Sequence, residues 1–491
     1  MMGFFFLPQA LLLILPTLAE SNDIVFGVAS WLESTARCRN TSRGLACTWA
    51  MNSTDDAPAQ YPYLSSSLYY GSPGIAIFFS QLSDAAEGDE KQRWSSLAQA
   101  ALEDVREGIG KSISSYGANV GFYYGLAGIA WSLRAASGTL ADSSPYFSAA
   151  GQIEAHILNN VAPFSDQANA KLWNNTDIAH GAAGTGLSLL WAAAQENDAV
   201  KASALRSGAR HAGKWLLDQA EEAPNSSGLR WWRGPDTDGS HVGDYYPTFC
   251  CGTAGVGYFL AQLSLTPDES DDWGFLQVAL QAGRHVLSLA VEPVKGTLLL
   301  PHGEQQPDTS TYFLGWCGGP PGWARLFVKL WEATGDGLWL DSIAKAVQGI
   351  ESFVLPNLTM VLPVGKHGAW QNLGQCCGAA AAGNFLLQFA SSDLPLPAAM
   401  KSKAMVAAKQ IAEAISSHAV QVTGGIALPS AEEHAVPSDT RWQAGWMQGA
   451  AGIASFLLHM HAVEIGSSAG LRQPWPDEPW KVSFRQKRGD V

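Results

Sequence analysis

A short turn bounded by two glycines recurs seven times along this chain of 491 residues. The first glycines of successive copies lie 54, 56, 71, 67, 59 and 71 residues apart, and each copy opens an apolar run such as IAIFF or LSLLWAAA. Such self-similarity predicts a repeat architecture, in which each unit buries its apolar face against its neighbours. The copies span residues 71–74, 125–128, 181–184, 252–255, 319–322, 378–383 (a looser copy) and 449–452.

The segments between the turns carry the period of amphipathic helices. In the first of them, apolar residues spaced by four, three and four positions lie on one helix face: Ala98, Leu102, Val105 and Ile109. The segment after each turn is instead apolar on nearly every side, as is typical of a helix buried between two layers. We therefore expect inner helices after the turns and outer helices before them, near residues 148–160, 199–220, 273–290, 338–355 and 398–418.

Seven helical hairpins of about 60 residues predict an all-α fold, an α/α toroid that forms a closed double ring. An open solenoid is the alternative, but it exposes an apolar face at each end and usually has atypical terminal repeats. Here the first and last turns, GSPGIAIFF and GAAGIASFLL, match the middle ones. The expected organisation is a signal peptide at 1–19, an N-terminal helix and loop at 20–60, the toroid at 61–465, and a tail at 466–491 that is a docked strand or disordered.

The N-terminus indicates export. An apolar segment of about 16 residues precedes Thr17-Leu18-Ala19, small residues at the positions that a signal peptidase reads. The segment is short for a membrane span, so we expect cleavage and a secreted or lumenal glycoprotein with no transmembrane segment. The lack of a basic region before it leaves an uncleaved anchor as the alternative. Five glycosylation sequons fit export, at Asn40, Asn52, Asn174, Asn225 and Asn357.

Composition narrows the class of partner. Only 15% of residues are charged and 19 are tryptophan, so the chain must bury a large apolar surface. The net charge of -14, with no basic cluster, disfavours nucleic acid and anionic membrane surfaces. We expect no nucleic-acid partner.

Seven cysteines in an exported chain are first interpreted as disulfides, and Cys38 with Cys47 is the most plausible pair. The other five all lie just before a glycine turn of repeats four, five and six: Cys250, Cys251, Cys317, Cys376 and Cys377. If the repeats are equivalent, these thiols meet at one rim of the ring, beside His180 of the third repeat. Zn²⁺ prefers thiolates and imidazoles in tetrahedral geometry. Disulfides among the five, either across the rim or between sequence neighbours, are the alternative.

Three motifs together resemble the lanthionine synthetase C-like family: AHGAAG at 179–184, WCGGPPG at 316–322 and QCCGAAAAGN at 375–384. Members of that family carry a WC-x-G-x-PG motif and a later CHG motif. The resemblance implies a seven-hairpin toroid that holds one zinc. Cys317 and Cys376 then stand in the positions of the two cysteine ligands, and Cys377 stands where the family has its ligand histidine.

The resemblance also implies an activity. Bacterial members activate a peptide cysteine thiol on zinc for addition to a dehydroamino acid, and eukaryotic members bind glutathione and add it to such residues. The expected substrate is therefore a peptide or glutathione thiol. His180 matches the family's histidine that supplies a proton to the enolate, although a capping or core histidine is the simpler interpretation. Two positions depart from the bacterial pattern, with Gly121 in place of Asp and Phe313 in place of Arg.

Other functions stay open at this point. Six-hairpin α/α toroids include glycosidases, and rim tryptophans with loop acids suit sugar binding. Hydrolysis needs two carboxylates about 5–9.5 Å apart, and nothing in the sequence pairs two of them. A non-catalytic zinc- or glutathione-binding protein and a toroid locked by disulfides are further alternatives. The residues behind the sugar hypothesis are Trp231, Trp232, Arg233, Trp316, Trp323, Trp370, Trp446, Asp236, Asp238, Asp244 and Glu304.

Overall fold

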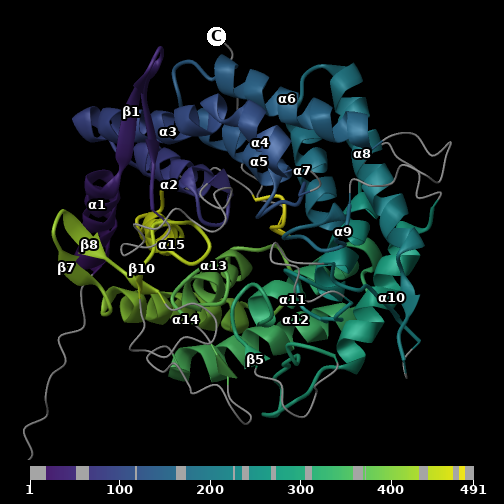
Figure 1. Cartoon of the computed structure of the whole chain (residues 1–491). Coiled ribbons are helices and arrows are strands. Elements are labelled where there is room, and N and C mark those ends of the chain that lie inside the picture. Colours follow the sequence, from purple (N-terminus) through teal and green to yellow (C-terminus); the bar gives the residue numbers. More distant parts are fainter. Residues whose placement is uncertain are drawn as a thin grey trace, which may run out of the picture.

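The chain forms two concentric rings of helices in a computed structural model (Figure 1). Each glycine turn opens a helix of the inner ring, as the sequence predicts. The inner helices are α2 (Ser72–Ala85), α5 (Leu126–Ser137), α7 (Ala182–Gln195), α9 (Thr253–Ser264), α11 (Pro320–Thr334), α13 (Ala379–Ala390) and α15 (Ala450–Glu464). The residues described are 18–50, 66–116, 119–161, 173–224, 227–234, 243–266, 273–304, 312–357, 369–370, 372–430, 441–467 and 475–480.

The outer ring covers the inner one, and each outer helix packs on the inner helix of its own hairpin. The seventh hairpin is completed across the chain, because the N-terminal helix α1 packs on α15, the last helix. The outer helices are α1 (Leu18–Thr35), α3 (Gly88–Glu107) with α4 (Ile109–Tyr116), α6 (Ser144–Asn160), α8 (Ala199–Asp218), α10 (Phe275–Ser288), α12 (Gly337–Gly349) and α14 (Ala398–Ser416). The all-α double ring is confirmed, and α12 continues into a π-helical turn (Ile350–Val354) and a 3₁₀ turn (Leu355–Asn357).

A closed circle of backbone hydrogen bonds joins the seven turns. The residue two positions before each first glycine donates its amide to the carbonyl of the equivalent residue in the next repeat, at 2.7–3.2 Å. The seventh residue, Met447, donates to the first, Tyr69. An open solenoid leaves the two end groups apart, so this circle distinguishes the ring from the solenoid. Its members are Tyr69, Tyr123, Ala179, Cys250, Cys317, Cys376 and Met447.

The recurring glycines are explained by close backbone approach. A Cβ atom at Gly128 would lie 1.7 Å from the carbonyl oxygen of Phe122, and one at Gly322 would lie 1.9 Å from that of Trp316. No side chain fits there, because the first turn of each inner helix packs directly on the loop that precedes it. The paired glycines of each turn thus mark the places where the backbone folds too tightly for a side chain.

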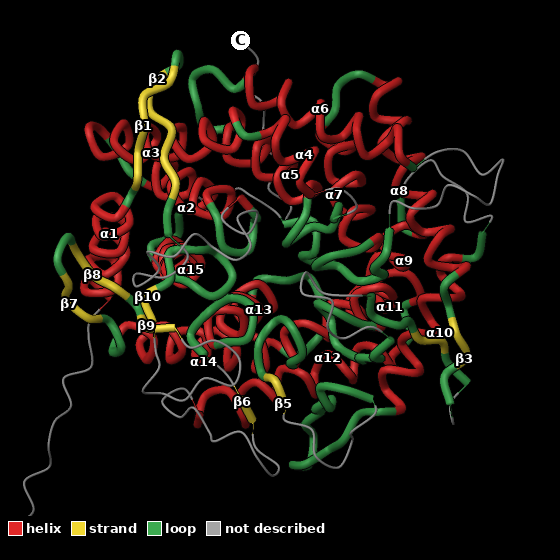
Figure 2. The backbone as a smooth tube through the Cα atoms, in the orientation of Figure 1, coloured by secondary structure: helices red, strands yellow, loops and turns green. Residues whose placement is uncertain are grey.

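Strands are short and lie at the periphery of the rings (Figure 2). The longest pair, β1 (Arg37–Thr41) and β2 (Gly44–Thr48), is an antiparallel hairpin that contains the predicted Cys38–Cys47 disulfide. The other pairs are β3 (Glu221–Glu222) with β4 (Leu229–Arg230), β5 (Tyr312–Phe313) with β6 (Ala369–Trp370), β7 (Val420–Val422) with β8 (Gly425–Ala427), and β9 (Pro429–Ser430) with β10 (Arg441–Trp442).

Residues 475–480 of the C-terminal tail lie inside the inner ring (Figure 1). Trp475 stacks on Trp446, with ring centroids 4.7 Å apart. The Asp477 carboxylate accepts hydrogen bonds from the Tyr123 hydroxyl at 3.0 Å and the Trp316 indole at 2.8 Å. Residues 475–480 are docked, as in one of the two expectations for the tail, but they form turns instead of a strand, because their partners are side chains of inner helices and turns.

The predicted signal segment lies outside the described residues except for its last two, which begin α1. Among the helices that are described, none is both long enough and apolar enough to cross a membrane.

Candidate metal and thiol site

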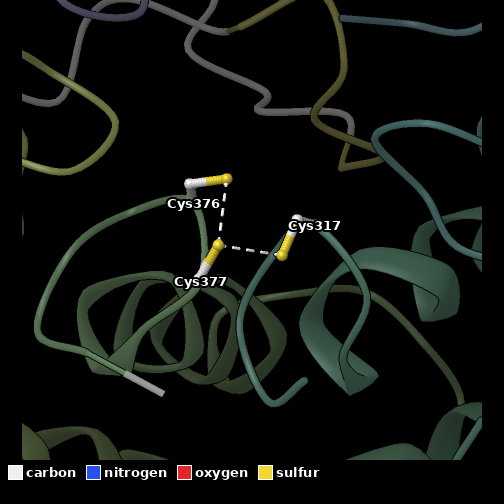
Figure 3. A group of neighbouring side chains, drawn as sticks. All are labelled: Cys317, Cys376 and Cys377. Carbon is white, nitrogen blue, oxygen red and sulfur yellow. Dashed lines mark hydrogen bonds between the residues drawn. The ribbon is translucent and has the colours of Figure 1, made fainter. Parts of the chain in front are cut away.

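Three thiols converge at the rim of the ring (Figure 3). The sulfur of Cys377 lies 3.1 Å from that of Cys317 and 3.4 Å from that of Cys376, and all three residues are buried. Their sulfurs lie within 4.8 Å of one another. Repeats five and six bring together three residues from two loops that are 59 positions apart in sequence, as the equivalence of the repeats predicts. We call these residues the three-thiol group.

The backbone circle holds the three-thiol group in place. The amide of Cys317 donates to the carbonyl of Cys376 at 2.8 Å, so the two loops cannot separate without breaking the circle. Gly315 makes the close approach possible, because a Cβ atom there would lie 2.3 Å from the carbonyl carbon of Cys377. Gln448 of the seventh repeat adds a donor to the Cys377 sulfur at 3.6 Å, and Asn372 holds that amide through a 2.6 Å hydrogen bond.

The electrostatics of the three-thiol group suit a cation. Hydrogen bonding with Cys317 and with Cys376 holds the pKa of Cys377 well below its usual value. Hydrogen bonding within the cluster, first with Cys250, and burial raise the pKa of Cys317, while burial raises the pKa of Cys376. Three thiolates this close repel one another unless a cation neutralises them. A set of three sulfur ligands fits Zn²⁺ and leaves one position open in a tetrahedral site.

His180 lies in a neighbouring group, not in the three-thiol group. Its backbone amide donates to Asp177 at 2.6 Å, and its Nδ1 lies 3.4 Å from the same carboxylate. The imidazole also stacks on Tyr124, with centroids 4.5 Å apart and planes 4° from parallel. Asp177, His180 and Cys251 offer ligand atoms within 4.8 Å of one another. Cys250 connects this group to the three-thiol group. Its sulfur lies 2.6 Å from that of Cys251 on one side and is hydrogen-bonded with the Cys317 side chain on the other.

Asp177 was missed by reasoning from the sequence, although a signal was present. It stands four residues before the third turn, the position that Gly121 occupies in the second repeat. A Cβ atom at Gly121 would lie 2.2 Å from the carbonyl carbon of His180, so no carboxylate fits there. The carboxylate beside His180 is therefore that of Asp177, which comes from the third repeat, and not one at position 121 of the second repeat. Aligning the repeats four positions before their turns identifies it.

Phe313 is the second residue that departs from the pattern implied by the family resemblance. The residue is buried, and its ring centroid lies 4.2 Å from that of His302. Phe313 therefore makes an aromatic contact at the position where the family resemblance implies an arginine.

Most of the described tryptophans behind the sugar hypothesis are buried, and Trp232 is partly buried. Trp231, Trp316, Trp323 and Trp446 are all buried, which agrees with their interpretation as packing residues. Glu304 pairs with Arg230 and with His285, each at 3.0 Å. Asp236, Asp238 and the Trp370 side chain lie outside the described residues.

The fold and the site together define a class: a seven-hairpin α/α toroid with a three-thiol group on its rim and a carboxylate-bound histidine beside it. The family model described as lanthionine synthetase C-like protein matches residues 62–225. This confirms the resemblance found in the sequence. The match covers the first three turns and His180, and the three-thiol group lies beyond it.

Among solved structures, nisin cyclase superposes with a TM-score of 0.57 at 16% identity, over 94% of this chain and 98% of that one. The GH76A alpha-1,6-mannanase from Salegentibacter sp. HEL1_6 gives 0.43 at 15% identity, over 74% of this chain and 98% of that one. Unsaturated glucuronyl hydrolase from Bacillus sp. GL1 gives 0.40 at 12% identity, over 93% and 99%. Of these three matches, we use only the one to nisin cyclase, and it supports the fold of the chain. No curated protein sequence matches the chain.

Proposed function

We propose that this chain is a zinc-binding protein of the lanthionine synthetase C-like type, which adds the thiol of a peptide cysteine or of glutathione to a dehydroamino acid. The observation that carries the proposal is the three-thiol group, in which Cys317, Cys376 and Cys377 offer three sulfurs to one cation. The family match over residues 62–225 and the nisin cyclase fold support the proposed class of reaction.

The three cysteines, His180 and Asp177 have different roles in the proposed reaction. The three cysteines would hold the metal, and a zinc ion bound there would offer an open position at which a substrate thiol is acidified. His180 holds a proton near the rim and delivers it to the carbon that becomes an enolate after thiol addition. Asp177 orients the imidazole through a contact with Nδ1. The burial of all three cysteines keeps bulk water from the metal.

The cavity beside residues 475–480 is too small for a peptide substrate. The cavity between residues 475–480 and the inner helices measures about 40 Å³ and is lined in part by Trp316, Trp446 and Asp477. A space of this size admits a few water molecules at most. We infer that the substrate approaches the outer side of the rim.

The replacement of a ligand histidine by Cys377 has a chemical consequence. A third thiolate donates more charge to zinc than a neutral imidazole does, which makes the metal a weaker Lewis acid. We therefore expect tight zinc binding with slow thiol addition. A protein that binds zinc and glutathione without turnover is the alternative outcome.

Elemental analysis of the purified chain, together with a glutathione addition assay on a dehydroalanine peptide, tests the proposal. We expect one zinc per chain, and its loss in Cys317→Ala. Cys251→Ser is the matched control, because Cys251 is a rim thiol outside the three-thiol group, and it should keep one zinc. Full zinc content in Cys317→Ala would refute the assignment.

We also propose that the mature protein is exported, lacks residues 1–19 and carries glycans. The side chains of Asn40 and Asn174 are exposed, and the Cys38–Cys47 disulfide suits an oxidising compartment. Mass spectrometry of the native protein tests this. An intact, unglycosylated N-terminus beginning at Met1 would contradict it.

A further inference from the structure

Two thiols at the rim have no part in the proposed zinc site. Cys250 and Cys251 are sequence neighbours whose sulfurs lie 2.6 Å apart. This separation is shorter than the 3.1 and 3.4 Å contacts within the three-thiol group. It approaches the length of a disulfide bond, which is about 2.0 Å. The two sulfurs are therefore placed to bond with each other.

The two sulfurs differ in access. Cys250 is buried, and its amide donates to the carbonyl of Cys317 in the backbone circle. Cys251 is only partly buried. A reagent from solution therefore reaches the sulfur of Cys251 before that of Cys250.

The surroundings of Cys251 favour thiol exchange. Its sulfur lies within 4.8 Å of ligand atoms of His180 and Asp177. The hydrogen bond with Cys250 and burial raise the pKa of the Cys251 thiol, and the nearby imidazole is a group that can take its proton when the sulfur attacks a disulfide. Cys250 supplies the neighbouring sulfur.

The number of cysteines also indicates that Cys250 pairs with Cys251. Of seven cysteines, two form the Cys38–Cys47 disulfide and three form the three-thiol group, which leaves Cys250 and Cys251. In an oxidising compartment, two remaining thiols at bonding distance oxidise with each other.

We propose that Cys250 and Cys251 form a redox-active vicinal pair that exchanges with low-molecular-weight disulfides such as oxidised glutathione. The Cys251 thiolate attacks one sulfur of the disulfide, forms a mixed disulfide and releases one thiolate. Cys250 then attacks the Cys251 sulfur, closes the vicinal disulfide and releases the second. The two thiol protons leave with the two released thiols, and the two electrons of the pair reduce the external disulfide.

The vicinal disulfide is readily reversed. Adjacent Cα atoms lie 3.80 Å apart across a trans peptide, which is below the usual 4.4–6.8 Å range for disulfides. Strained disulfides of this kind are the reducible ones, so the pair cycles with the thiol-to-disulfide ratio of its surroundings. This activity goes beyond the proposed thiol addition and does not depend on it.

The first test treats the zinc-loaded full chain with oxidised glutathione and maps its peptides without reduction. We expect a peptide that has lost two hydrogens across Cys250 and Cys251, recovery of both thiols with reduced glutathione, and one retained zinc. Two free thiols after treatment, or a disulfide that joins Cys250 to Cys317 instead, would overturn the proposal.

The second test uses the difference in access. In Cys250→Ser no second thiol is present to resolve the mixed disulfide, so Cys251 should accumulate bound glutathione. In Cys251→Ser the buried Cys250 should stay unmodified under the same conditions. Retention of one zinc by both variants shows that they are folded. Equal modification of the two variants, or a second zinc that Cys251→Ser loses, would show that the pair is not a redox site.

Discussion

Gly315 is the position where the ring geometry and the three-thiol group can be tested together. Its φ angle lies outside the left-handed region, so alanine is allowed by the backbone there, and the effect of Gly315→Ala is steric. The added Cβ atom would lie 2.3 Å from the Cys377 carbonyl carbon and 2.3 Å from the Gly378 amide nitrogen. Both are backbone atoms, so no side-chain rotation relieves the contact.

The expected cost is that of overpacking, about 1–3 kcal/mol. Because the nearest atoms belong to Cys377 and Gly378, relief of the strain moves the Cys377 sulfur. If that whole cost is taken from zinc binding, zinc affinity falls by about 5- to 150-fold at 1.4 kcal/mol per tenfold change. A chelator competition assay with a zinc indicator measures this loss, and a thermal melt of the same sample reports stability.

Gly151→Ala is the matched control, because this helical glycine in α6 has nothing within 4 Å of its added Cβ atom. The change should leave zinc affinity unaltered and stabilise the helix by about 0.8–1.0 kcal/mol at most. A Gly315→Ala protein that binds zinc as tightly as wild type and melts no lower would refute the link between ring packing and the three-thiol group.

Two further predictions follow from the rim and from the tail. Cys377→His restores the ligand set of the family, so it should keep one zinc and raise the rate of glutathione addition, measured on a dehydroalanine peptide; a rate that stays the same or falls would count against the weak Lewis acid argument. Burial raises the pKa of Glu478 to about 7 although Arg325 and Gln388 oppose the shift, so between pH 4.5 and 7 the folded chain keeps a proton that the unfolded chain releases. Since this pKa is higher in the folded state than its ordinary 4.5, stability should fall as pH rises from about 4.5 to 7. Glu478→Gln should flatten that fall in thermal midpoints taken across the pH range; an unchanged profile would argue against it.

The tail gives the site an inner support. Asp477 joins Tyr123 and Trp316, one residue of the backbone circle and one neighbour of Cys317. Arg325 of α11 adds a hydrogen bond to the Asp477 carbonyl at 2.6 Å. Residues 475–480 therefore contact the rim from the inside of the ring. Because Asp477 bonds to Trp316, the packing of the tail affects the position of Cys317.

The sequence alone determined the elements that repeat. Seven turns with nearly even spacing predict seven hairpins, because each copy obeys the same local steric rule, seen at Gly128 and Gly322. The meeting of Cys317, Cys376 and Cys377 was also predictable, since equivalent positions of neighbouring repeats become neighbours in a ring. The Cys38–Cys47 disulfide followed from two cysteines close together in a short polar stretch.

Only the tertiary structure decided the contacts that do not repeat. The packing of α1 on α15 and the contacts of the tail residue Asp477 below the rim each join segments that are far apart in the sequence, and each occurs once. A contact that occurs once leaves no period in the sequence, and its energy comes from side chains that meet only after the ring has closed. The physical reason is the same for both: local sterics repeat along the chain, whereas closure of the ring brings distant residues together once.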